Sequence, residues 1–156
     1  MTQEEKVLLL KDLSARLPYG VICKSVNFKN PTTLVTIDLD GPLHSVYFCT
    51  NDEGSMWNDY DDIKPYLFPL SSMTAEQKRE LLTLTGYDIR CEESCGFDSW
   101  GFYINTVGEY RYEDNQESII LYPDYKAIDW LNKNHFDYRG LIPRGLAHDA
   151  TDKNIY

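Results

Sequence analysis

Apolar residues recur at helical spacing near both ends of the chain and alternate with polar residues between these ends. Near the N-terminus, Thr2 and Glu5 form a capping box, in which each side chain satisfies a free N–H group at a helix start. The apolar positions that follow are three or four residues apart: Val7, Leu10, Leu13 and Leu17. This pattern predicts a helix that ends at Pro18 and Gly20, and its broad apolar face favours packing against a sheet.

Three strands are predicted after this helix. Residues 21–26 and 44–50 are rich in β-forming residues, and residues 34–39 alternate between apolar and polar side chains. Turn-forming residues at 40–42 separate the second strand from the third. We therefore expect the three segments to form an antiparallel meander.

The middle of the chain is less regular. Residues 51–62 are interpreted as a polar loop, and residues 63–72 as an irregular stretch because two prolines interrupt it. A second capping box, formed by Thr74 and Gln77, predicts a middle helix that ends at Gly86.

A final helix is predicted from about Tyr125 to Tyr138, between a cap at Pro123-Asp124 and a stop at Gly140. One stripe of this helix carries Ile128, Leu131, His135 and Tyr138. We expect the helix to bury Ile128, Trp130 and Leu131, and the residues from about 149 onward to fray.

These elements together predict the α+β class. A second β stretch at 87–122, with its best strands at 100–104 and 118–122, separates the middle helix from the final helix. The 156 residues suit one domain, 1–156, which buries about two thirds of the surface of the unfolded chain. We expect an antiparallel sheet on which N-terminal, middle and C-terminal helices pack.

The sequence also indicates a compartment. No apolar run is longer than four residues, whereas a membrane-spanning helix needs about 20. The first residues are acidic rather than basic, so we expect no secretory signal and a cytoplasmic protein with reduced thiols. The cysteines are Cys23, Cys49, Cys91 and Cys95. Only Cys91 and Cys95 are close in sequence, and no second pair stands at the spacing of a zinc site.

The formal net charge of -10 comes from two segments. Residues 88–117 carry eight acids and two bases, and residues 51–62 carry five acids and no base. One interpretation is a pair of solvated loops that keep the protein in solution. The other is a single acidic surface that binds a basic partner or a hard cation.

The sequence contains no nucleophile elbow, phosphate-binding loop or dinucleotide fingerprint. We therefore predict no catalytic residue, no metal ligand set and no cofactor. His135 does not face Asp137 on a helix, so a core position is favoured over a general base. The apolar segment 65–69 is interpreted as core packing or as a surface patch. The candidate binding residues are Asp52, Glu53, Asp59, Asp61, Asp62, Tyr66 and Phe68.

Three stretches carry a resemblance to a known family: LLKDLSARLPYG at 9–20, DIKPYLFPLSSMT at 62–74 and DWLNKNHFDYRGLI at 129–142. The chain resembles an uncharacterised family of small proteins from phages, prophages and mobile elements of gut Bacteroidetes. Phe68 stands where a basic residue is usual in that family. The resemblance implies this origin and a cytoplasmic setting in the host bacterial cell, and it carries no catalytic residue over.

Two functions are therefore expected to compete. The first is a non-enzymatic accessory or interaction protein that uses its acidic surface to bind a protein with a basic surface, with no direct contact to nucleic acid or membrane. The alternative is a small metal-dependent hydrolase or nucleotide-modifying enzyme, with the acids of 52–62 as metal ligands.

Overall fold

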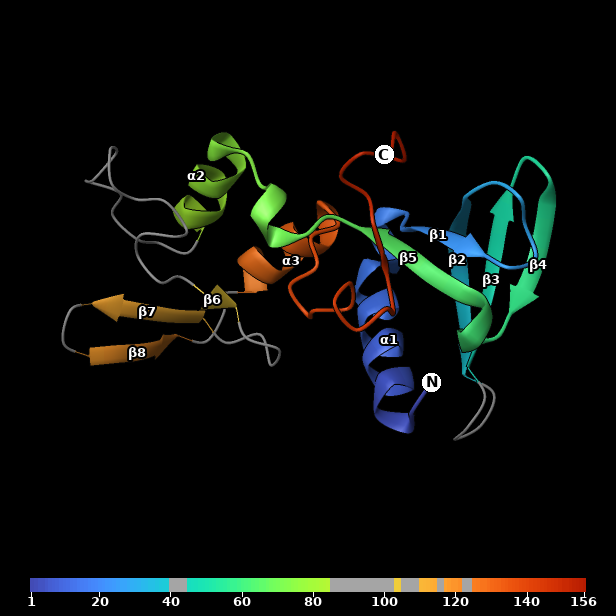
Figure 1. The fold of residues 1–156 in the computed structure, drawn as a ribbon, viewed down its shortest axis with the longest axis horizontal. Coiled ribbons are helices and arrows are strands. Elements are labelled where there is room, and N and C mark those ends of the chain that lie inside the picture. Colours follow the sequence, from blue (N-terminus) through green and yellow to red (C-terminus); the bar gives the residue numbers. More distant parts are fainter. Residues whose placement is uncertain (40–44, 85–102, 105–109, 115–116, 122–124) are drawn as a thin grey trace. The chain divides into compact units, whose positions relative to one another are not determined.

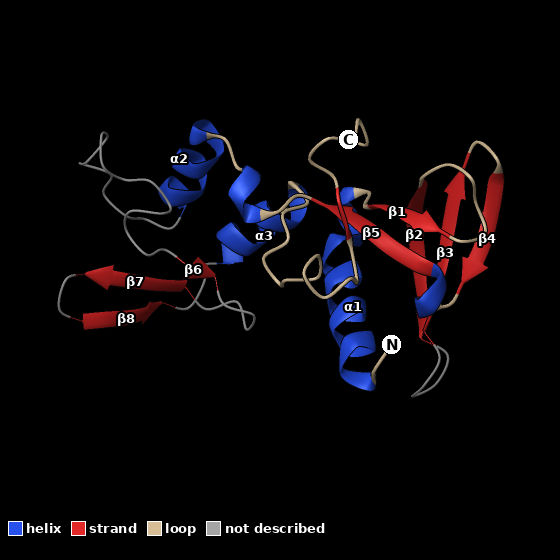
Figure 2. Cartoon of the chain, viewed as in Figure 1, coloured by secondary structure: helices blue, strands red, loops and turns tan. Residues whose placement is uncertain are grey.

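The computed structural model describes most of the chain (Figure 1), and the ranges that it describes are 1–39, 45–84, 103–104, 110–114, 117–121 and 125–156. Two compact units make up the fold: the first comprises Met1–Phe68 and Leu141–Tyr156, and the second comprises Pro69–Gly140. Helices and strands occur in both units (Figure 2), which confirms the α+β class. The expectation of a single domain over 1–156 stays a prediction.

A six-stranded sheet with the order β4-β3-β2-β1-β5-β9 is the framework of the first unit. Its strands are β1 (Ile22–Ser25), β2 (Thr32–Leu39), β3 (Ser45–Asn51), β4 (Gly54–Asn58), β5 (Ile63–Leu67) and β9 (His148–Asp149). The meander is confirmed, because β1, β2 and β3 are antiparallel neighbours. The prediction of a wholly antiparallel sheet is wrong, since β9 runs parallel to β5. The chain between Leu67 and His148 is long enough for a parallel connection.

Helix α1 (Gln3–Arg16) packs on one face of this sheet (Figure 1). The capping box is confirmed: the Glu5 N–H donates to the Thr2 hydroxyl over 3.2 Å, and the Thr2 N–H donates to the Glu5 carboxylate over 2.7 Å. A 3-10 turn, Leu17–Tyr19, follows the helix. The turn ends at Gly20, whose φ of 67° lies in the left-handed region that glycine adopts without strain.

The two faces of the sheet differ in exposure. The inner face forms a buried core with α1 that includes Leu9, Leu13, Cys23, Leu34, Tyr47, Cys49, Ile63 and Leu67. On the outer face, Val35 of β2 and Trp57 of β4 are 49% and 47% exposed. A covered face and an exposed face are the usual arrangement when helices pack on one side of a largely antiparallel sheet.

The prediction that residues 51–62 form only a polar loop is wrong, because they contain β4. This strand pairs with β3 from the turn, where Asn51 opposes Gly54, to its last residue. The Phe48 and Trp57 rings of the hairpin lie 5.0 Å apart. Such cross-strand aromatic pairs stabilise antiparallel strands.

Residues 63–72 were predicted to be irregular, but they contain β5. Pro65 lies inside this strand, opposite Cys23 of β1. Proline lacks an N–H group and is tolerated where one side of a strand is unpaired. Pro65 meets that condition, since β9 aligns only with Tyr66 and Leu67.

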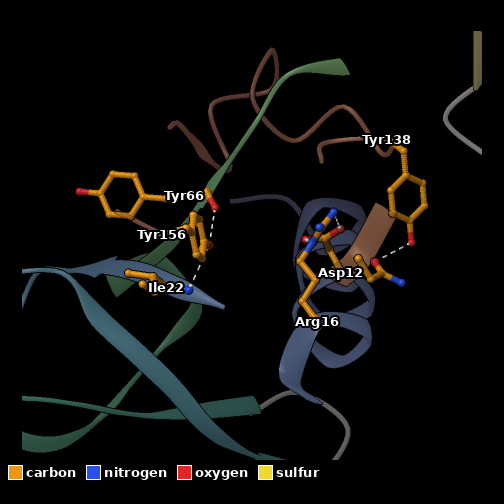
Figure 3. Close-up of polar contacts among 7 residues, drawn as sticks. Asp12, Arg16, Ile22, Tyr66, Tyr138 and Tyr156 are labelled. Carbon is orange, nitrogen blue, oxygen red and sulfur yellow. Dashed lines mark hydrogen bonds and ion pairs between the residues drawn. The ribbon is translucent and has the colours of Figure 1, made fainter. Parts of the chain in front are cut away.

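The C-terminal segment is held in place, so the prediction of fraying from about Asp149 is wrong. The Ala150 N–H donates to the Leu67 carbonyl over 2.9 Å, and Ala150 is buried. The Tyr156 hydroxyl donates to the Tyr66 carbonyl over 2.8 Å and accepts from the Ile22 N–H over 3.2 Å (Figure 3). These bonds tie the end of the chain to β1 and β5.

The second unit contains two helices and a small sheet. Its described elements are a 3-10 turn (Leu70–Ser72), α2 (Ala75–Leu84), β6 (Tyr103–Ile104), β7 (Tyr110–Asp114), β8 (Glu117–Leu121) and α3 (Tyr125–Lys133). The strands pair in the antiparallel order β6-β7-β8. At the start of α2, Thr74 and Gln77 exchange hydrogen bonds of 2.9 and 3.2 Å. Among the helices of the described residues, none is long and apolar enough to cross a membrane.

Helix α3 ends at Lys133, earlier than the predicted end at Tyr138. The Phe136 N–H donates to the Leu131 carbonyl over 3.0 Å, and the His135 N–H donates to the Asn132 carbonyl over 3.1 Å. This pair of bonds is a Schellman motif, which requires a left-handed residue after the helix. His135 takes that position with a φ of 57°, although it is not a glycine.

Packing explains why a histidine is tolerated there. The Trp130 and Phe136 rings stack 5.7 Å apart, which supplies the apolar contact that usually accompanies a Schellman motif. Trp130 and Leu131 are buried as predicted, whereas Ile128 is half-buried. The predicted cap at 123–124 lies outside the described residues.

Candidate functional site

The acids of 51–62 lie at both ends of β4. Asp52 and Glu53 form the turn between β3 and β4, where Gly54 has a φ of 133° that favours glycine. Asp59 follows β4 directly and begins a 3-10 turn, Tyr60–Asp62, which leads into β5. The hairpin therefore places carboxylates before and after one short strand.

An unpaired carboxylate is costly to bury, and four of these acids are exposed accordingly: Asp52, Glu53, Asp59 and Asp61. Asp62 is half-buried instead. Its carbonyl accepts from the Val26 N–H over 2.9 Å, so its backbone is held against the end of β1. Asp61 lies 3.5 Å from the amino group of Met1, and its side chain stays 63% exposed.

Glu53 has a structural role that the sequence did not suggest. Its carboxylate accepts from the N–H groups of Lys29 and Asn30 over 3.1 and 3.2 Å. It also accepts from the Asn30 side-chain amide over 2.6 Å. These bonds join the loop before β2 to the turn before β4, so this acid is partly occupied within the fold.

The strand between the acids is the feature that sequence reasoning missed. β4 is the outermost strand of the six-stranded sheet on its side, and it carries no charged residue. Its Met56 and Trp57 side chains are 46% and 47% exposed. The sequence did hold one signal for this strand, because Trp57 follows the predicted strand at 44–50 after a short turn.

An edge strand of this kind is chemically available for pairing. Alternate N–H and C=O groups of an edge strand point away from the sheet and have no strand partner. Proteins commonly protect such an edge with lysine or proline, and β4 contains neither. The combination of free backbone groups, two apolar side chains and flanking carboxylates defines the candidate site, which we name the β4 edge.

Tyr66 and Phe68 do not belong to the β4 edge. Tyr66 is 8% exposed, and its ring lies 5.3 Å from the His148 ring. Phe68 is half-buried, and its ring lies 5.8 Å from the Tyr156 ring. For Tyr66 the core interpretation therefore holds, and the interpretation as a surface patch is wrong.

The structure does not assemble the acids into a metal site. Across the described ranges, no three histidine, cysteine, aspartate or glutamate residues lie close enough together to hold a metal ion. Most of the second acidic segment, 88–117, lies outside the described residues. The prediction that it shares one face with 51–62 therefore stays a prediction.

Other polar groups in the first unit are buried for structural reasons. Arg16 donates to the two carboxylate oxygens of Asp12 over 2.8 and 3.0 Å, and both side chains are fully buried (Figure 3). Burial raises the pKa of the Cys23 and Cys49 thiols, which disfavours the reactive thiolate. In the second unit, His135 is buried as expected for a core position.

Comparison with known proteins adds no relative to this description. Searches against family models, curated proteins and solved structures find no match to the chain. The functional conclusion therefore rests on the geometry of the β4 edge.

Proposed function

We propose that this chain is a non-enzymatic interaction protein that binds a basic protein partner at the β4 edge. The observation that carries the proposal is the uncharged outermost strand, with its two half-exposed apolar side chains, between two groups of carboxylates. An accessory role in a phage or mobile element, which the family resemblance implies, is part of the same proposal.

The arrangement suits a protein interface. Protein interfaces have a desolvated apolar centre, often anchored by tryptophan or methionine, inside a polar rim. Here Trp57 supplies an apolar centre on the outer face, Met56 adds an apolar side chain on the opposite face of the same strand, and Asp52, Asp59 and Asp61 supply the rim. Carboxylates at a rim speed the encounter with a cationic surface and contribute specificity.

The backbone adds a second contribution. A partner strand that pairs with β4 would form main-chain hydrogen bonds, as in other cases of strand addition to a sheet edge. Lysine or arginine residues that flank such a strand would meet the carboxylates at both ends of β4. The favoured partner therefore presents an extended segment with basic flanks.

Charge disfavours a second copy of this chain as the occupant. Antiparallel self-pairing of β4 about Met56 aligns Gly54 of one copy with Asn58 of the other. The next position aligns Glu53 with Asp59, so like charges oppose each other at both ends. Directly opposed like charges destabilise strand pairs.

The test is capture of a basic protein from host-cell extract, followed by binding kinetics with the identified partner. In the site variant, Asp52, Asp59 and Asp61 are changed to Asn. In the control variant, Glu4, Glu76 and Glu80, which are also exposed, are changed to Gln. Both variants lose the same net charge.

We expect the site variant to lower the association rate at least about tenfold and the control variant to change it far less. Salt should reproduce the effect on the wild type, because exposed charges are screened beyond about 8 Å at physiological ionic strength. Equal losses in the two variants would mean that only net charge matters and would reject the β4 edge.

A further inference from the structure

Two lysines oppose each other on the outer face of the sheet, far along the strand order from β4. Lys24 of β1 aligns directly with Lys64 of β5. Their Cβ atoms are expected about 5 Å apart, and like charges at such positions destabilise a sheet. The pairing is notable because the chain has 25 acids and 15 bases, and yet no acid stands opposite either lysine.

Further cationic and aromatic groups gather on the same face. Tyr66 is two residues after Lys64 on β5, so its side chain points to the same side, and it aligns with His148 of β9. Burial lowers the pKa of His148, and the charges of Lys64, Lys153 and Lys24 lower it further. Three ammonium groups therefore act on one imidazole.

These lysines have no carboxylate partner in the part of the chain that the structure describes. Lys24 is oriented by the fold, since its ammonium donates to the carbonyls of Phe28 and Lys29 over 3.2 and 3.0 Å. Asp149 is the acid closest in sequence to His148, and its carboxylate accepts from the N–H and hydroxyl of Thr151 over 2.8 and 2.7 Å. Lys153 also lowers the pKa of Asp149, but less than these bonds do.

We propose that Lys24, Lys64 and His148 form a binding site for a phosphate group, either free or carried as a phosphate monoester. A phosphate dianion offsets the repulsion between two ammonium groups at once, which a single carboxylate does not. The imidazole of His148 contributes one further donor. This site lies on β1, β5 and β9, so it stands or falls independently of the β4 edge.

The experiment follows the His148 imidazole by NMR during a pH titration, in chloride and in inorganic phosphate at matched ionic strength. A bound phosphate favours the charged imidazolium, so the pKa of His148 should be higher in phosphate than in chloride. Phosphate should also raise the melting temperature, because a ligand that binds only the folded chain stabilises it. Equal pKa values in the two salts would overturn the proposal.

Two charge-matched variants locate the effect. Lys64→Gln should raise the pKa of His148 in chloride, since one positive neighbour is lost, and it should weaken phosphate binding about tenfold. Lys11→Gln removes the same charge from an exposed position on α1 and should leave both properties unchanged. Equal weakening in the two variants would reduce the site to nonspecific charge and overturn the proposal.

The form of the ligand is decided by a third arm with a nucleoside monophosphate. Tighter binding than inorganic phosphate would support a phosphate monoester as ligand, and weaker binding would support the free anion. Failure of both anions to bind would overturn the proposal.

A cooperative thermal transition checks that each variant is folded. Lys64→Gln is expected to fold, because it removes a like-charge pair.

Discussion

The two edges of the six-stranded sheet are built in opposite ways. At one edge, β9 is only two residues long, and the C-terminal segment beyond it returns to bond with β1 and β5. At the other edge, β4 has five uncharged residues and two half-exposed apolar side chains. A very short edge strand is a common way to protect a sheet against unwanted pairing. This contrast between the two edges supports our proposal that a partner strand pairs with β4.

The largest expected effect comes from helix α1, which packs on the sheet that carries both edges. Asp12→Asn removes the charge that pairs with Arg16 inside α1, and both groups are fully buried. Loss of one partner of a buried ion pair typically costs 3–5 kcal/mol, so the free energy of unfolding should fall by about that amount. Urea denaturation measures the change. A loss below about 1 kcal/mol would show that the pair does not anchor the helix.

The next prediction distinguishes binding at the β4 edge from binding at the outer face of the sheet. Trp57→Lys places a charge on β4 and removes the aromatic centre, so partner binding should weaken about thirtyfold, or ~2 kcal/mol. Stability should fall by less than about 1 kcal/mol, because only a cross-strand pair is lost. Val35→Lys is the matched control, since Val35 is equally exposed but lies on the interior strand β2. Equal binding losses in both variants would remove the distinction between edge and face.

The closed edge is tested by Tyr156→Phe. This change deletes only the hydroxyl that bridges the Ile22 N–H and the Tyr66 carbonyl. Burial raises the pKa of this phenol, so it stays protonated and able to donate at neutral pH. We expect a loss of about 1–2 kcal/mol in unfolding free energy and faster hydrogen exchange at Ile22. Unchanged exchange at Ile22 would mean that the Tyr156 hydroxyl does not hold the end of the chain against β1.

The smallest effect is a pH dependence at the closed edge. Bonds from the Thr151 N–H and hydroxyl lower the pKa of Asp149 in the folded chain. A lowered pKa contributes stability above the unfolded value near 4, and that stability is lost as the pH falls through the folded value. The protection of the Thr151 amide against hydrogen exchange, relative to the unfolded chain, should therefore fall only at acidic pH. Asp149→Asn should remove this pH dependence, and a variant that kept it would point to another group.

Much of the local structure was predictable because its signals lie within a few residues of each other. The capping box at Thr2 and Glu5 and the alternation in 34–39 are complete in the sequence, and the structure contains both elements. The exposure of Asp52, Asp59 and Asp61 was predictable for a similar reason, since an unpaired carboxylate is costly to bury wherever the chain places it.

The end of α3 shows where local signals fail. The final helical stripe continues through His135 in the sequence, and Gly140 is the obvious residue for a stop. The helix nevertheless ends at Lys133, because His135 adopts a left-handed backbone conformation. The stacking of Trp130 on Phe136 supplies the apolar contact that stabilises this ending. Propensity ranks glycine first for that position, and packing overrides the rank.

The sequence by itself determined the α+β class, the first helix, the meander and the presence of exposed acids. Only the tertiary structure decided which strand is outermost, because strand order depends on pairing between distant residues and no periodicity encodes it. Tyr66 meets His148, and the Tyr156 hydroxyl reaches Ile22, across most of the chain. The same long-range pairing gives β4 a strand on one side only among the described residues, and it brings Lys24 beside Lys64. Both proposed sites therefore arise from contacts between segments, whereas the elements that carry them arise from local sequence.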